Sequence, residues 1–201
     1  MKKIILIGGG GHCKSVIDVI EQDGRYKIMG IVDKPKLLGT KVLGYPVIGC
    51  DLDLHLLVKK FRYALITVGQ IKTALKRVKL FNLANKIGFT LASVVSPRAY
   101  VSKHSKIGKG TIVMHNAIIN ANSFIGDNCI INTKVLVEHD CSISNHCHIS
   151  TNATINGGNQ IGANSFVSSN VATRQYIKIP KNSFVKKSGL TKQSVILKKQ
   201  K

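Results

Sequence analysis

The second half of the chain carries an aliphatic residue at every sixth position. The series starts at Val95 and ends at Val185, and only Thr173 departs from it. A period of six matches neither the 3.6-residue period of a helix nor the alternation of an ordinary strand, and it is typical of a parallel β-helix. The aliphatic positions are Val95, Val101, Ile107, Val113, Ile119, Ile125, Ile131, Val137, Ile143, Ile149, Ile155, Ile161, Val167, Ile179 and Val185.

Mostly small residues follow four positions after each aliphatic one, and Asn, Gly and Asp fill the positions between, as tight corners require. Three hexapeptides make one triangular coil, so residues i and i+18 are predicted to stack about 4.8 Å apart. The pattern predicts roughly five coils over residues 95–201. A narrow core of this kind has no room for large rings, which agrees with the absence of Trp.

The first half shows the shorter periods of an α/β domain, predicted over residues 1–94. KKIILI indicates a strand that runs into a glycine loop, residues 12–22 a helix, and YKIMGIVD a second strand that ends at Asp33. LHLLVKKF indicates a short helix, YALITVG a third strand, and KTALKRVKLFNLANKIG a basic amphipathic helix capped by Gly88.

Composition narrows the class of protein. The net charge of +21 is shared almost equally by the two halves, so it predicts either a solvated cationic surface or a phosphate-rich partner: a nucleotide, coenzyme A or nucleic acid. Five cysteines without CxxC spacing argue against a disulfide framework. The N-terminal apolar run is too short for a signal peptide, and no run of 18 apolar residues exists. We therefore expect a cytoplasmic protein without membrane insertion.

Residues 137–150, VEHDCSISNHCHIS, concentrate potential metal ligands. The hexapeptide register points Cys141 and Cys147 inward and stacks Cys147 over Cys129, so we expect buried, reduced thiols. His146 and His148 flank an inward residue and point outward. Ligands that diverge cannot close a tetrahedral zinc site within one chain, so no metal is expected, although ligands shared between subunits remain an alternative.

His139 has a different setting. It lies on the outer surface of a coil between Glu138 and Asp140, and a neighbouring carboxylate can fix the tautomer that a general base needs. Its stacked neighbours, Ala121 and Gly157, are small, and Asn120, Glu138 and Asn156 are predicted to form a polar ladder beside it. We therefore predict a catalytic role for His139 rather than that of a solvated surface residue.

The glycine run before the first helix suggests a ligand site, because backbone N–H groups there can approach phosphates or a ribose. The dinucleotide fingerprint GxGxxG is not satisfied, since its third glycine would fall on Cys13 or Lys14. NAD is therefore not expected. Asp33 lies where an acidic residue can bond a ribose or sugar hydroxyl, and a tight turn without a ligand is the alternative.

Together, GGGGHxxxVIDVI, IVD, LGYPVIG, the hexapeptide array and INTxxxVEHD resemble the bacterial sugar acetyltransferases of the hexapeptide-repeat type. That family includes sialic acid O-acetyltransferases and N-acetyltransferases of nucleotide-linked 4-amino sugars. The resemblance implies a Rossmann-like α/β domain followed by a left-handed parallel β-helix. It also implies a homotrimer that holds acetyl-CoA between adjacent β-helices and a nucleotide sugar on the N-terminal domain.

The resemblance also implies roles for particular residues. His139 resembles the general base, supported by Asp140 and Glu138. The coenzyme contacts implied by the resemblance are His148, Gly157, Ser169 and Lys187. The residues that match the nucleotide-sugar site are Gly10, Gly11, His12, Asp33, Lys34 and Gly69. His104 and His115 are candidates to face the groove between subunits. The C-terminal VKKSGLTKQSVILKKQK and the TVGQI turn depart from the family pattern.

The expected activity is therefore acetyl transfer from acetyl-CoA to the amine of a UDP- or dTDP-linked 4-amino-4,6-dideoxy sugar in surface-glycan biosynthesis. O-acetylation of a sialic-acid-type sugar is the alternative. A β-helix zinc lyase is a weaker one. Only the net charge suggests a nucleic-acid-binding module. The chain lacks the interleaved aromatic residues on which single-stranded nucleic acid stacks, so no nucleic-acid partner is expected.

Overall fold

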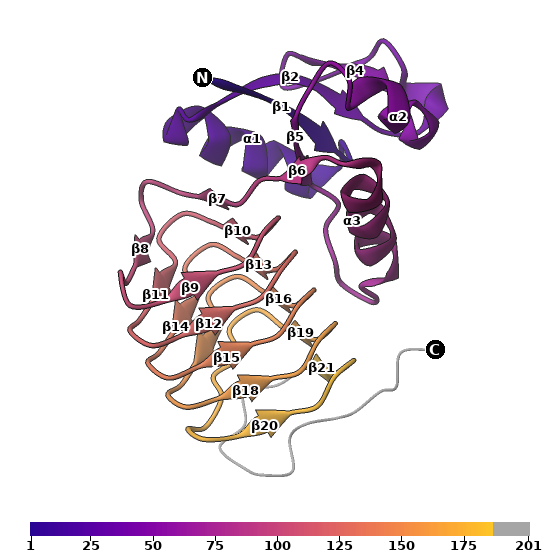
Figure 1. The fold of residues 1–201 in the computed structure, drawn as a ribbon. Coiled ribbons are helices and arrows are strands. Elements are labelled where there is room, and N and C mark those ends of the chain that lie inside the picture. The colour runs from indigo at the N-terminus through magenta and orange to yellow at the C-terminus, as the bar shows by residue number, and fades with distance from the viewer. Residues whose placement is uncertain (187–201) are drawn as a thin grey trace.

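The computed structural model describes residues 1–186, which form an α/β unit seated on one end of a β-helix (Figure 1). The α/β unit holds a six-stranded sheet in the order β3-β4-β2-β1-β5-β6, parallel except for the β3–β4 pair. Its strands are β1 (Lys2–Ile7), β2 (Tyr26–Val32), β3 (Lys41–Val42), β4 (Tyr45–Gly49), β5 (Tyr63–Ile66) and β6 (Thr90–Leu91).

Helices cover both faces of this sheet, because alternate residues of β1 are buried on opposite sides. Ile4 and Leu6 pack with α1 (Gly11–Asp23), and Ile5 and Ile7 pack with the other helices. The helices on this other face are the short α2 (Leu54–Leu57) and α3 (Leu75–Ile87). Two 3₁₀ turns, η1 (Pro35–Leu37) and η2 (Asp51–Asp53), lie in the loops. The predicted β-α-β unit and the cap at Gly88, whose φ is 104°, are confirmed.

The predicted hexapeptide register is confirmed along the described part of the β-helix. Every strand pairs with the strand 18 residues away, so that Ile112 lies against Ile130 and Ile130 against His148. One sheet contains β7 (Val94–Val95), β10 (Ile112–Val113), β13 (Ile130–Ile131), β16 (His148–Ile149), β19 (Phe166–Val167) and β21 (Phe184–Val185). The second contains β8 (Tyr100–Val101), β11 (Ile118–Ile119), β14 (Leu136–Val137) and β17 (Thr154–Ile155). The third contains β9 (Lys106–Ile107), β12 (Phe124–Ile125), β15 (Ser142–Ile143), β18 (Gln160–Ile161) and β20 (Lys178–Ile179).

The corners of the coils repeat a left-handed backbone conformation at every sixth residue. Asn supplies most of these positions, because its short polar side chain tolerates positive φ better than most others. Asp140 and His146 occupy two of them, with φ of 60° and 61°. Asp140 and His146 therefore form turns of the coil, whether or not they also take part in chemistry.

The break in the aliphatic series at Thr173 has a partner inside the coil. Asn159, in an inward position that mostly small residues occupy, is fully buried, and its Nδ2 donates to the Thr173 hydroxyl while its Oδ1 accepts from the Ile177 N–H. Two inward polar side chains thus satisfy each other, which keeps the register intact without an aliphatic residue.

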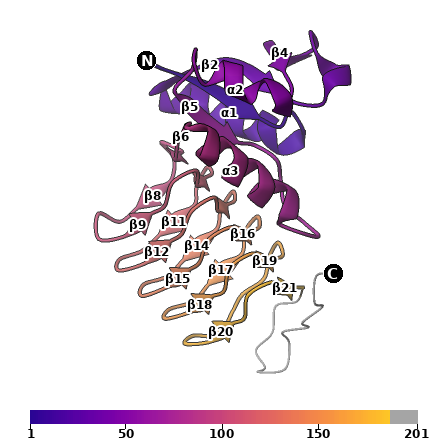
Figure 2. The same ribbon diagram turned by 45° about the vertical axis from the view of Figure 1, so that its right-hand side comes forward.

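The two units meet along a buried seam. α1 lies between the α/β sheet and the first coils, because its apolar residues share a cluster with Val94, Ile112 and Met114. β7 begins at Val94, so the β-helix starts one residue before the expected division at 94/95. α3 extends beside the upper coils (Figure 2), where the ring of Phe81 meets that of His146 edge to face.

Two polar side chains are held at this seam. α3 is the predicted basic helix, but one of its basic residues is buried: Arg77 is 1% exposed and donates to the carbonyls of Ile66, Val68 and Asn128. Burial lowers the pKa of Arg77 to about 10, so it stays charged at neutral pH. His115 lies with its Nε2 2.7 Å from an Asp18 carboxylate oxygen on α1, and its place in a groove between subunits stays a prediction.

Candidate functional site

His139 lies at the corner between β14 and β15, and its imidazole is held by the next residue. Nδ1 lies 2.7 Å from Asp140 Oδ2, and the other oxygen of Asp140 accepts from Asn122 Nδ2, one coil earlier. The Asn122 hydrogen bond, followed by that of His139, lowers the pKa of Asp140. An ionised acceptor at Nδ1 places the ring proton there, which leaves Nε2 free to accept a proton.

Gly157 makes room for this ring. A Cβ at residue 157 would lie 2.9 Å from His139 Cε1 and 3.0 Å from Nε2, closer than real side chains pack. The Gly158 N–H also donates to the His139 carbonyl at 3.0 Å. The predicted small neighbour is thus confirmed, and the imidazole rests directly on the glycine backbone with half of its surface exposed.

The polar ladder beside His139 is confirmed only in part. Asn120 Nδ2 donates to Glu138 Oε2 at 2.8 Å, as the register predicts. Asn156 does not extend the ladder, because its Nδ2 donates to the carbonyl of Thr173. Glu138 therefore faces Asn120 and is not held from the other side by Asn156.

A second cluster of predicted residues lies at the seam of the two units, around a cavity of about 960 Å³. The structure brings together there all six residues assigned to the nucleotide-sugar site, and His148 with them. The lining from the α/β unit includes Gly10, Gly11, His12, Asp33, Lys34, Gly69 and Lys76; the lining from the β-helix includes Asn132, Thr133, His148 and Thr151.

The N-terminus of α1 opens into this cavity. Gly10 and Gly11 have open space where a Cβ would stand, and no acidic residue lies in the first turn of the helix. His12 is largely buried, and its Nε2 has no hydrogen-bond partner among the described residues. Burial, followed by the charge of Arg77, lowers the pKa of His12 to about 3. A neutral imidazole and free backbone N–H groups therefore face the cavity, a setting that suits a phosphate or a hydroxyl.

Among residues 1–186, Asp33 is the only carboxylate on the cavity wall, and its side chain holds the glycine loop. Its Oδ2 accepts from the Gly9 N–H and its Oδ1 from the Lys34 N–H. Backbone donors thus occupy both oxygens, and each keeps further acceptor capacity for a ligand hydroxyl. The two lysines on the wall, Lys34 and Lys76, leave the cavity positive overall.

His148 points away from the coil axis, as predicted, but it is covered by the α/β unit and is 7% exposed. Its Nδ1 lies 2.5 Å from the Gln70 carbonyl, and its Nε2 lies 3.2 Å from Asn132 Nδ2. Burial lowers the pKa of His148 to about 4. A coenzyme contact at His148, which stays a prediction, would have to be made through the seam cavity.

The remaining coenzyme residues lie elsewhere. Ser169 is exposed, and its hydroxyl lies 2.9 Å from that of Ser150. Lys187 falls outside residues 1–186 and so outside the described residues. His104 is exposed on an early coil. In the part of the chain that the structure describes, no group of three or more His, Cys, Asp or Glu side chains is arranged to hold a metal ion.

One chain does not unite the two clusters. The cavity is lined by the corners after β13 and β16, whereas His139 occupies the corner after β14 and is not part of its wall. The sheet that contains β14 and β17 separates the two corners. Within one chain, the predicted base and the cavity therefore lie at different corners of the coils.

Sequence reasoning missed several cavity residues. Lys76 falls within the predicted basic helix, and Asn132 and Thr133 fall within the INTxxxVEHD segment that carries the family resemblance, but none of the three is among the predicted site residues. Arg77 gave no signal of its own, because its burial depends on a contact 51 residues away.

The chain is similar to a known family and to several solved structures. Residues 3–81 match the PglD N-terminal domain family. The acetyltransferase domain of PglB from Neisseria gonorrhoeae FA1090, solved with acetyl coenzyme A, is 30% identical, with a TM-score of 0.87; the alignment covers 94% of this chain and 90% of that one. A search of curated protein sequences gave no match.

Two further structures share the architecture. PerB from Caulobacter crescentus, in complex with CoA and GDP-perosamine, is 30% identical, with a TM-score of 0.76 over 92% of this chain and 93% of that one. WeeI from Acinetobacter baumannii AYE is 22% identical, with a TM-score of 0.70 over 92% of this chain and 96% of that one, and supports the fold.

Proposed function

Because the chain belongs to the bacterial sugar N-acetyltransferases of the hexapeptide-repeat type, we propose that it acetylates the amine of a nucleotide-linked 4-amino sugar in surface-glycan biosynthesis. Acetyl-CoA is the donor. The nucleotide sugar occupies the seam cavity, and His139 is the base. Support for the UDP or dTDP carrier comes from the sequence resemblance alone, and one relative was solved with GDP-perosamine, so a guanine nucleotide is also a candidate.

The cavity supplies what a diphosphate and a sugar need. Lys34, Lys76 and the N-terminus of α1 suit the diphosphate. The Asn132 and Thr133 side chains, with the free Nε2 of His12, suit sugar hydroxyls. The nearly carboxylate-free wall also disfavours a protonated amine, and only the neutral amine can attack a thioester.

The reaction is an acyl transfer with one proton to move. The amine nitrogen attacks the thioester carbonyl carbon while His139 Nε2 takes the amine proton, and the C–S bond then breaks to release the coenzyme as a thiolate that takes up a proton. Asp140 holds the ring by Nδ1 and stabilises the imidazolium that forms. A positioned general base typically raises the rate of such a step by about 10²- to 10⁴-fold.

We place the complete site between subunits of a trimer. The observation that supports this most directly is the separation of His139 from the cavity within one chain. The sheet between them also presents exposed apolar side chains: Tyr100 is 59% exposed and Ile118, stacked on it, 40%. An apolar face of this kind favours a partner surface, and closed cyclic symmetry is the common outcome for a repeated one.

The coenzyme is proposed to run from the His139 corner along the coils, past Gly157. Ser169 lies at the corner after β19, on the other side of the sheet that contains β14 and β17, so it would reach this coenzyme from a neighbouring subunit. We place the reaction in the cytoplasm, which the five free cysteines support, since thiols persist in a reducing compartment. Within residues 1–186, no helix has the length and apolar character that crossing a membrane requires.

The test is a thiol-release assay with acetyl-CoA and a panel of UDP-, dTDP- and GDP-linked amino sugars. We expect release with at least one 4-amino sugar and a loss of about 10²-fold or more in His139→Ala, with acetyl-CoA binding retained. Turnover with a sialic-acid-type hydroxyl acceptor alone would favour O-acetylation instead. Near-normal turnover of His139→Ala at saturating acceptor would exclude the assigned base.

A further inference from the structure

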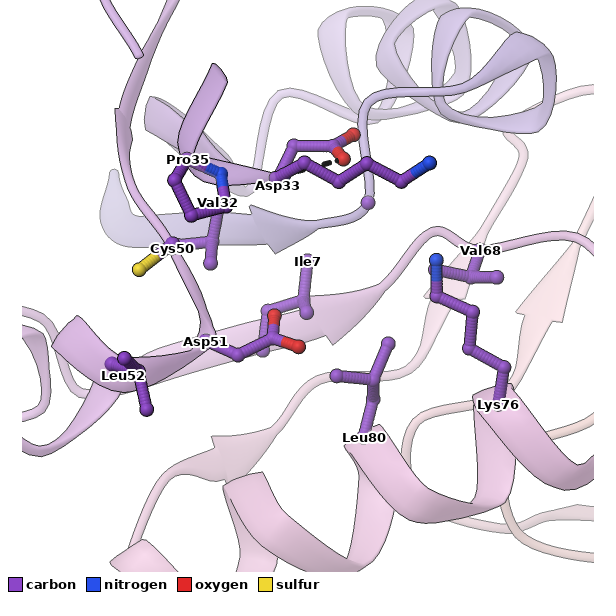
Figure 3. Close-up of a pocket in the computed structure, with 12 residues that line it drawn as sticks. Ile7, Val32, Asp33, Pro35, Cys50, Asp51, Leu52, Val68, Lys76 and Leu80 are labelled. Atoms are coloured by element: carbon purple, nitrogen blue, oxygen red, sulfur yellow. Dashed lines mark hydrogen bonds between the residues drawn. The ribbon is translucent and has the colours of Figure 1, made fainter. Parts of the chain in front are cut away.

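A second cavity, of about 170 Å³, lies at the carboxyl ends of β1 and β2 and continues the seam cavity (Figure 3). The two share lining residues at their junction: Gly8, Asp33, Lys34, Val68 and Lys76. The walls beyond the junction are mostly apolar and include Ile7, Val32, Pro35 and Leu80. A flat, largely apolar ring system fits such a slot, with a charged group at the lysines.

Asp51 differs from the other acidic residues around this cavity. Asp33 is held by two backbone N–H groups, and nearby Asp53, just outside the lining, accepts from the Cys50 N–H. Asp51 lines the cavity with an exposed carboxylate that has no hydrogen-bond or ion-pair partner among the described residues. Figure 3 shows it pointing toward Ile7 and Leu80, across the mouth of the slot.

The polar, basic and apolar wall residues follow one another along the two cavities in the order of the sugar, diphosphate and base of a nucleotide sugar. If the sugar lies against Asn132 and Thr133 and the diphosphate against Lys34 and Lys76, the base extends into the smaller cavity, because that is the space beyond the lysines. Its polar edge then meets Asp51.

We propose that this smaller cavity binds the nucleobase and that the Asp51 carboxylate selects guanine. A carboxylate offers two adjacent acceptor oxygens and no donor. Guanine presents two adjacent donors, N1–H and the exocyclic N2–H, which pair with both oxygens at once. Uracil and thymine present one N–H between two carbonyls, and adenine presents its amino group beside an acceptor nitrogen, so each sets an acceptor against a carboxylate oxygen.

This inference rests on the proposed function and departs from the UDP or dTDP carrier expected from the sequence. It is tested with nucleoside diphosphates alone, without acetyl-CoA or sugar. We expect calorimetry on the full chain to show GDP binding at least tenfold tighter than UDP, dTDP or ADP. Asp51→Asn replaces one acceptor by a donor and should weaken GDP binding by about 10- to 100-fold while leaving UDP binding nearly unchanged.

Two controls locate the effect. Glu21→Gln makes the same change of charge on α1, away from both cavities, and should leave GDP binding unchanged. The chain contains no Trp, so Leu52→Trp places a single tryptophan on the wall of the smaller cavity, where a bound base should change its fluorescence. Three results would each overturn the assignment. They are equal affinities for GDP and UDP, an unchanged GDP affinity in Asp51→Asn, and a tryptophan fluorescence of Leu52→Trp that does not change when GDP is added.

The outcomes separate this inference from the acetyl-transfer proposal. Guanine binding that depends on Asp51, with no acetylation of any GDP-linked amino sugar, would leave the base site standing and remove the proposed reaction. If the protein acetylates a UDP- or dTDP-linked sugar at a rate that Asp51→Asn does not change, the proposed reaction stands and the guanine site is removed.

Discussion

Gly157→Ala tests whether His139 works from the position in which the structure holds it. The φ of Gly157 lies outside the left-handed range, so the backbone accepts alanine without strain. The added methyl group is therefore aimed at one target, the imidazole ring, at 2.9 Å from Cε1 and 3.0 Å from Nε2. The ring must move by about 0.5 Å or more to restore an ordinary contact of 3.4 Å or longer.

A displacement of that size should change the free energy of unfolding little but lower the catalytic rate strongly. His139 is half exposed, so its ring can swing toward solvent, and we expect a change in unfolding free energy of at most about 1 kcal/mol. A misplacement of about 1 Å at a reacting group can cost 10²-fold in rate. We therefore expect kcat to fall by about 10- to 100-fold in the thiol-release assay.

A double-mutant cycle separates the base from the coenzyme. In a His139→Ala background the methyl group at residue 157 meets no ring, so adding Gly157→Ala should cost little further activity. If Gly157→Ala instead costs the same factor with and without His139, it acts through the coenzyme or the backbone, and the steric reasoning is refuted. Ala121→Gly, on the other side of the same stack, is the matched control and should leave kcat nearly unchanged.

Asp33→Ala should raise the KM of the nucleotide sugar and leave that of acetyl-CoA nearly unchanged, and equal losses for both substrates would contradict a separate acceptor site. Stability should fall on mild acidification, because His148 and His12 stay neutral in the folded protein while the unfolded chain takes up protons below about pH 6.5; for His148 alone the loss approaches roughly 3 kcal/mol by pH 4. Thermal melts between pH 7 and 5 measure this, and a flat profile would contradict it. Arg77→Leu should lower the free energy of unfolding by about 2–5 kcal/mol, because three backbone carbonyls lose their donor, whereas Lys79→Leu on the exposed side of α3 should change it little; equal denaturant midpoints for the two variants would rule this out. Light scattering should give a mass near three times 21.9 kDa, and a catalytically active monomer would remove the shared site.

The local sequence determined the β-helix and the corner that carries His139. The repeat leaves little choice, because each inward residue packs on residues 18 positions away and a shift by one would turn the aliphatic series outward. Adjacency in the chain offered His139 two carboxylates, Glu138 and Asp140, and the structure pairs it with Asp140 while Glu138 faces Asn120. The ladder failed at Asn156 because Thr173, which breaks the series, offered its carbonyl instead.

Only the tertiary structure decided what surrounds the acceptor cavity. His148 meets the Gln70 carbonyl across 78 residues, and Arg77 meets the Asn128 carbonyl across 51. Neither contact has a periodic signature, because each depends on how the α/β unit sits on the coils rather than on the pattern of either unit. The free carboxylate of Asp51 belongs to the same class, since only the fold shows which of three nearby aspartates the backbone leaves unpaired.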